Sequence, residues 1–207
     1  MAEKSPLNII IPESANLQLP DDSLLSFYTD LENRTFWISD EINIFSLNLI
    51  HYILKWNRED APIPPTERKP IKLLFFSPGG DLDINYAIID IIKLSQTPII
   101  GINLGMCASA AAYIFLSCHQ RFMLPHAYFL FHQGSGSFGG TFDQIISQVE
   151  DYQDQVKELS KILGEATNYT EAEIEEKIGG EWYVRQAEAL EKGVVTKIIT
   201  NINEFEG

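Results

Sequence analysis

A chain of 207 residues is long enough to form one domain with a substantial hydrophobic core. Its composition, 45% hydrophobic and 21% charged, is typical of an ordinary globular protein. The formal net charge of −14 argues against a nucleic-acid partner and against anionic membranes, because no basic stripe exists to neutralise phosphates. No apolar run is long enough for a signal peptide or a membrane span, so we expect a cytoplasmic protein.

The first third of the chain leads into an α/β pattern. Residues 1–26 are rich in Pro, Ser and Asp without a clear period, which indicates an N-terminal arm. "RTFWIS" (34–39) predicts a strand, and residues 41–57 predict an amphipathic helix with Phe45 on its apolar face. Residues 58–70 form a charged, proline-rich loop, since internal prolines forbid a regular element.

The middle of the chain alternates strands with helices. "IKLLFF" (71–76) is a continuous apolar run, typical of a parallel strand buried on both faces. "SPGG" (77–80) breaks this strand, and residues 81–95 then predict a helix. "TPIIGINLG" (97–105) predicts a second buried strand, followed by a helix over 107–118.

The last third contains the longest helical pattern, at residues 140–166. Two short strands precede it, a helix with capping-box spacing follows at 170–179, and one more helix and strand close the chain. The alternation of strands and helices predicts one α/β domain with a mostly parallel sheet and right-handed crossovers.

Three short stretches could carry chemistry. In "SPGG", Gly79 and Gly80 follow a buried strand, where bare backbone N–H groups could hold an oxyanion. A plain turn is the alternative.

Ser109, in "GMCAS", lies at the start of a helix, which suits a nucleophile. The N–H of Ala110 could there stabilise the negative charge that develops when the serine attacks. A small residue in a tightly packed helix is the alternative, and the G-x-S-x-G elbow of α/β-hydrolases is absent.

His132 ends an apolar strand and precedes a glycine-rich run, which suits a general base that is fixed on one side and exposed on the other. An incidental histidine at a strand end is the alternative. The remaining histidines lie in mid-helix or beside a short strand, and Cys107 and Cys118 look like small buried apolar residues. No Cys/His/Asp spacing resembles a ligand set, so we expect neither a metal nor another cofactor.

Taken together and in order, "SPGG", "GMCAS", "MLPHAYFLFHQ" and "AEALEKGVVTKII" resemble the segments of the Clp protease proteolytic subunit family. The resemblance runs from about Phe27 to Thr200. It implies the repeated βαβ spiral that this family shares with the crotonases, within a peptidase domain over residues 27–207. It also implies that the helix at 140–166 protrudes as a handle.

The resemblance assigns roles to individual residues. Ser109 matches the nucleophile and His132 the general base. Counted back from "AEAL", the acid of the triad falls on Glu181, where the family normally has Asp; a solvated loop acid is the alternative. The remaining roles are the oxyanion N–H donors, Gly79, Gly80 and Ala110, and the residues that bind an extended substrate, Asp81, Leu82, Gln133 and Gly134.

The implied function is a serine endopeptidase that hydrolyses peptides and unfolded polypeptides inside an oligomeric chamber. The family implies two stacked seven-membered rings and an AAA+ unfoldase, which alone uses ATP. The apolar stripe of residues 140–166 is too long for one small domain to bury, which favours oligomerisation without fixing the number of subunits; packing of the stripe on the chain's own sheet is the alternative. A catalytically silent ring subunit and, with less support, a crotonase-type acyl-CoA enzyme or a Ser–Lys peptidase are the alternatives.

Overall fold

The computed structural model describes residues 21–205, and the chain divides after Asn33 into two compact units. In the first unit, helix α1 (Asp22–Glu32) begins at Asp21, whose carboxylate accepts a hydrogen bond from the Ser23 N–H at 2.9 Å. Residues 1–26 have no clear period and so indicated no helix, whereas the family resemblance, which begins at about Phe27, implied the end of a helix here. Residues 1–20 of the predicted arm lie outside the described residues, and the domain boundary at 26/27 stays a prediction.

The second unit begins at Arg34 and carries one seven-stranded sheet within the described residues. Its strands are β1 (Thr35–Ile38), β2 (Ile71–Ser77), β3 (Ile99–Ala108), β4 (Gln120–Met123), β5 (Tyr128–Phe131), β6 (Trp182–Arg185) and β7 (Lys197–Ile198). Its α-helices are α2 (Asn48–Glu59), α3 (Leu82–Leu94), α4 (Ala110–Leu116), α5 (Phe142–Ala166), α6 (Glu171–Ile178) and α7 (Gln186–Glu191). Three 3₁₀ segments complete it: η1 (Ile44–Leu47), η2 (Pro65–Glu67) and η3 (Ile202–Phe205).

The sheet is mostly parallel, as the alternation of elements predicts. Its main path is β1-β2-β3-β4-β7, with every neighbouring pair parallel. Strand β3 changes partner along its length: Ile100–Asn103 pair with β4, whereas Met106–Ala108 pair with β5. Strand β6, which the sequence did not predict, pairs antiparallel with β5. The long β3 therefore carries the chain from the main sheet into a second, smaller layer formed by β5 and β6.

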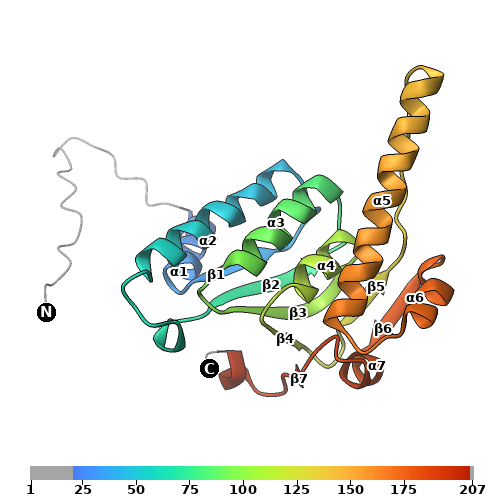
Figure 1. Cartoon of the computed structure of the whole chain (residues 1–207). Coiled ribbons are helices and arrows are strands. Elements are labelled where there is room, and N and C mark those ends of the chain that lie inside the picture. The colour runs from blue at the N-terminus through green and yellow to red at the C-terminus, as the bar shows by residue number, and fades with distance from the viewer. Residues whose placement is uncertain (1–20, 206–207) are drawn as a thin grey trace, which may run out of the picture. The chain divides into compact units, whose positions relative to one another are not determined.

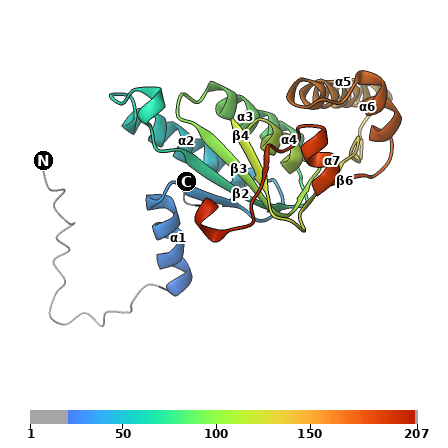
Figure 2. The ribbon, with the colours of Figure 1, turned by 90° about the horizontal axis from the view of Figure 1, so that it is seen from below.

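Helices α2, α3 and α4 cover one face of this sheet, as Figures 1 and 2 show. The opposite face holds a smaller apolar cluster, to which the C-terminal segment contributes Ile199 and Phe205. The sheet contributes Leu74, Ile100 and Ile102 to this cluster. Strands β2 and β3 are thus buried on both faces, which explains why their sequences read as continuous apolar runs.

The predicted helix at 41–57 begins instead as the 3₁₀ segment η1, which Asn43 caps through the Phe45 N–H. The tighter winding of a 3₁₀ turn changes the angular position of each side chain. Phe45, which we expect on the apolar face, is consequently 77% exposed. Leu49 and Ile53 of α2, farther along the same stripe, are buried.

Helix α5 is the longest element and matches the predicted helix at 140–166 closely. Thr141 and Gln144 form a capping box at its start. Only its second half is buried in the body, through Leu159, Ile162 and Leu163. In Figure 1 its first half, drawn in orange-yellow, extends beyond the sheet and its covering helices. The exposed apolar residues of this first half include Phe142 and Ile146.

Candidate active site

Ser109 occupies a strained corner between β3 and α4. Its backbone has φ 51° and ψ −130°, and it shares a positive φ with only one other non-glycine residue among those described. Such conformations cost about 1–3 kcal/mol and cluster at functional sites. The Ser109 side chain makes no capping hydrogen bond to α4. Its N–H donates to the carbonyl of Leu130 at 2.8 Å, which fixes the corner against the end of β5.

The "SPGG" segment packs directly against this corner. Gly79 has φ 97°, and a Cβ placed on it would lie 2.6 Å from the Ser109 Cβ and 2.9 Å from the Ala110 nitrogen. Only glycine fits there. Gly80 has φ 152°. The residues on both sides of it bond to the backbone of Ile42: the Ile42 N–H donates to the Gly79 carbonyl at 2.8 Å, and the Ile42 carbonyl accepts the Asp81 N–H at 2.9 Å.

The backbone N–H groups at this corner differ in their availability. The Gly79 N–H already points to the hydroxyl of Ser77, at 3.2 Å. The Gly80 N–H donates to no group in the described part of the chain. The Ala110 N–H lies in the first turn of α4, where an N–H has no intrahelical partner. Gly80 and Ala110 are therefore better placed as oxyanion donors than Gly79.

His132 comes to the same place because β5 runs parallel to the end of β3. Ala108 pairs with Leu130, so Ser109 and His132 each lie just beyond the same edge of the sheet. Both line a cleft of about 700 Å³, together with Gly80. Across residues 21–205 the structure has no hydrogen bond between Ser109 and His132, an arrangement common in enzymes without bound substrate.

The four residues predicted to bind substrate also line this cleft: Asp81, Leu82, Gln133 and Gly134. Asp81 caps α3 by accepting the Ile84 N–H at 3.0 Å. Three acidic residues line the cleft, Glu41, Asp81 and Asp83, whereas no Lys or Arg among the described residues does. Tyr152 and Gln155 of α5 form another wall, which the sequence did not predict because it depends on the packing of distant elements.

Among the described residues, no hydrogen bond or ion pair joins Glu181 to His132. Its carboxylate is exposed and accepts the Tyr183 hydroxyl at 2.8 Å. The strand register nevertheless ends with Phe131 opposite Trp182, so the next position on each strand sets His132 opposite Glu181. Directly opposite residues of an antiparallel pair project to the same face. Glu181 is thus on the correct side of the sheet, but it is bonded elsewhere.

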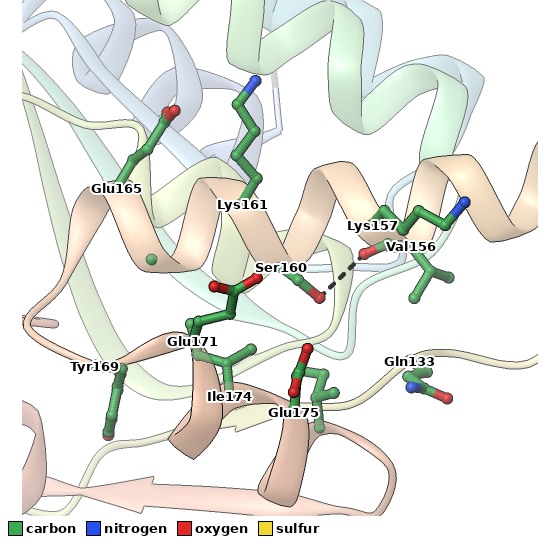
Figure 3. Close-up of a pocket in the computed structure, with 12 residues that line it drawn as sticks. Gln133, Val156, Lys157, Ser160, Lys161, Glu165, Tyr169, Glu171, Ile174 and Glu175 are labelled. Atoms are coloured by element: carbon green, nitrogen blue, oxygen red, sulfur yellow. Dashed lines mark hydrogen bonds between the residues drawn. The ribbon is translucent and has the colours of Figure 1, made fainter.

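A second hollow of about 750 Å³ lies between α5 and α6, and Gln133 borders it as well as the cleft (Figure 3). Val156 and Ile174 contribute apolar surface from the two helices, and charged residues such as Lys161 and Glu175 surround it. The Ser160 hydroxyl donates back to the Val156 carbonyl at 3.2 Å. This hollow was not predicted from the sequence, because it forms only where α6 packs on α5.

Other reactive groups are less suited to chemistry. Cys107 and Cys118 are buried free thiols, and burial raises the pKa of each well above its ordinary value. They are consequently neutral and poor nucleophiles. In the described ranges no group of three or more His, Cys, Asp or Glu residues could hold a metal ion. No helix among residues 21–205 is long and apolar enough to cross a membrane.

The same fold occurs in a solved structure. A ClpP1 mutant from Listeria monocytogenes superposes with a TM-score of 0.73 at 23% identity, covering 86% of this chain and 98% of that one. At sequence level, the Clp protease family model matches residues 29–202. The chain therefore belongs to the Clp protease family.

Individual relatives of moderate identity match two thirds or more of both chains. The ATP-dependent Clp protease proteolytic subunit 2 of Bifidobacterium longum is 32% identical over 82% of this chain and 81% of its own. The subunit 2 of Treponema denticola is 28% identical over 91% of this chain and 92% of its own. The proteolytic subunit of Paracoccus denitrificans is 33% identical over 67% of this chain and 70% of its own.

Proposed function

We propose that the protein is a serine endopeptidase that hydrolyses peptides and unfolded polypeptides, with Ser109 as nucleophile and His132 as general base. The observation that carries this proposal is the corner itself. A strained serine, a histidine and an unpaired glycine N–H lie on one cleft in a chain of the Clp protease family. Backbone strain at a serine whose side chain makes no capping hydrogen bond indicates a role beyond packing.

The reaction is acyl transfer in two stages. His132 takes the proton of the Ser109 hydroxyl as its oxygen attacks the peptide carbonyl. The carbonyl oxygen becomes an oxyanion that the N–H groups of Gly80 and Ala110 stabilise. His132 then gives the proton to the leaving amine. Water, deprotonated by His132, releases the acyl group and restores the serine.

Glu181 completes the proposed triad only after its side chain moves. A carboxylate beside the imidazole orients it and stabilises the positive charge that it acquires. To do so, Glu181 exchanges its bond with the Tyr183 hydroxyl for one with His132. Substrate binding along the end of β5 is the step at which we place this exchange.

The exposed apolar side chains in the first half of α5 support the assembly of several subunits. We propose two stacked seven-membered rings in the cytoplasm, with an AAA+ unfoldase feeding polypeptides into the chamber and hydrolysing the ATP. The relatives are named as ATP-dependent proteolytic subunits, which supports such a partner.

A silent ring subunit is the second candidate function. It is favoured by one observation: Glu181 is exposed and bonded to Tyr183 rather than to His132. Such a subunit would assemble with an active partner subunit and would not itself turn over substrate.

Turnover of a short fluorogenic peptide separates the two candidates. We expect the wild type to hydrolyse the peptide and Ser109→Ala to lose activity by at least about a thousandfold. Ser117→Ala is the matched control: Ser117 ends the same helix, its hydroxyl only bonds back to Tyr113, and activity should be unchanged. An assembled wild type without turnover would instead establish the silent subunit.

A further inference from the structure

Polar residues on one stripe of α5 hold the glycine-rich segment that follows His132. Gln148 bonds to both backbone groups of Gly139, donating to the carbonyl at 3.1 Å and accepting the N–H at 3.4 Å. One turn farther along, the Tyr152 hydroxyl donates to the Gln133 carbonyl at 3.0 Å. Residues at i and i+4 share a helix face. The segment 133–140 therefore runs beside α5 as an anchored strip, visible in Figure 1.

The Tyr152 bond lies closest to the proposed base. Strand β5 ends at Phe131, so sheet pairing restrains His132 from its N-terminal side only. On its C-terminal side the next residue is Gln133, whose N–H donates to the Ile178 carbonyl at 3.1 Å. Tyr152 supplies the other bond to this residue. Gln133 is consequently fixed between α6 and α5, and His132 is fixed through it.

Gly134 and Tyr152 fit each other closely. Gly134 has φ 88°, and a Cβ built on it would lie 2.6 Å from the Tyr152 hydroxyl oxygen. The Phe138 ring packs edge-on against the Tyr152 ring, with centroids 5.6 Å apart. Burial raises the pKa of Tyr152, so its hydroxyl stays protonated and donates at neutral pH.

We propose that Tyr152 is a positioning residue for His132, acting through the Gln133 carbonyl to hold the imidazole toward Ser109. This inference rests on the proposed peptidase function. The Tyr152 hydroxyl bonds to the backbone beside the base, and Tyr152→Phe keeps the ring that lines the cleft, so loss of the hydroxyl lowers the rate of acylation more than it weakens substrate binding.

The test compares Tyr152→Phe with Tyr86→Phe. Both substitutions remove one tyrosine hydroxyl that bonds to a backbone carbonyl, and the Tyr86 hydroxyl donates to Gln155 of the same α5 at 2.6 Å. Only Tyr152→Phe releases the segment that carries His132. For a short peptide we expect Tyr152→Phe to lower kcat by about three- to tenfold with KM within about twofold, as loss of one positioning hydrogen bond allows. Tyr86→Phe should leave both within about twofold.

Amide hydrogen exchange of residues 133–140 gives an independent readout, and it should rise in Tyr152→Phe but not in Tyr86→Phe. If the wild type is active and Tyr152→Phe is equally active, the positioning role of Tyr152 is wrong, whereas the proposed peptidase function stands. A fall in kcat that Tyr86→Phe reproduces overturns it too, since both would then act through general stability. A wild type that turns over no peptide contradicts the proposed function itself.

Discussion

Ser109 lies at a corner that three separate segments build. The strand end fixes its N–H on Leu130, the Gly79 backbone occupies the space beside it, and His132 faces the same cleft. The sequence alone identified Gly79, Ser109 and His132 as candidate site residues, because each follows an apolar run that predicts a strand. That they lie on one cleft could not be predicted from the sequence, because it depends on the register of β3 against β5.

Glu181 is the residue whose role depends most on a movement. If it supports His132, Glu181→Gln should lower kcat for a short peptide by at least about tenfold, because an amide cannot stabilise the imidazolium by charge. Glu176→Gln, an exposed acid on α6, is the control and should have no effect. Tyr183→Phe frees the Glu181 carboxylate and should maintain or raise activity. Unchanged kcat in Glu181→Gln would show that Ser109 and His132 act without it.

At the scale of elements, the long periodic segments were predictable and the short ones were not. The helix at 140–166 and the buried strands agree with the structure to within a few residues. Strand β6 was missed although Trp182 and Val184 alternate with exposed residues, because four residues give too short a pattern. The start of helix α1 was missed because residues 1–26 have no clear period, and only the family resemblance implied the end of this helix. Tyr152 was missed because its role depends on a contact across the fold, which sequence spacing does not encode.

One buried ion pair joins the start of β1 to the end of α2. Arg34 donates two hydrogen bonds of 2.6 Å to the Asp60 carboxylate, and the Thr97 hydroxyl donates a third at 2.8 Å. Asp60 is 1% exposed, so removing it leaves a largely buried guanidinium without its partner. None of these three residues lines the cleft, so we expect the pair to stabilise the fold and to take no part in catalysis.

We predict that Asp60→Ala lowers the free energy of unfolding by about 3–5 kcal/mol. Glu59→Ala, which removes an exposed pair with Lys55, should cost at most about 1 kcal/mol. Hydrogen bonding to Arg34 lowers the pKa of Asp60 below its ordinary 3.8, so its contribution is complete above that pH and is lost as pH falls through the lower folded value. Chemical denaturation between pH 7 and pH 2 measures both effects, and equal costs for the two variants would contradict them.

At the scale of the whole molecule, the first half of α5 presents apolar side chains without cover. Phe142 is 78% and Ile146 43% exposed. Burying such a side chain stabilises an assembly by about 1.5–3 kcal/mol. A second subunit is the cover that we propose, in agreement with membership of the Clp protease family.

The double substitution Phe142→Ser/Ile146→Ser should therefore reduce the mass of the assembly, measured by light scattering, while circular dichroism shows an intact fold. Ile202→Ser is the control, since Ile202 is 76% exposed but lies outside α5, in η3. An unchanged mass in the double variant would place the interface elsewhere.

The central claim, that Ser109 is an activated nucleophile, is tested most directly by a fluorophosphonate probe followed by mass spectrometry of the modified peptide. The account predicts one adduct on Ser109 in the wild type, none in Ser109→Ala, and slow formation in Glu181→Ala. An assembled wild type that stays unlabelled, or that carries its adduct on another residue, would contradict it.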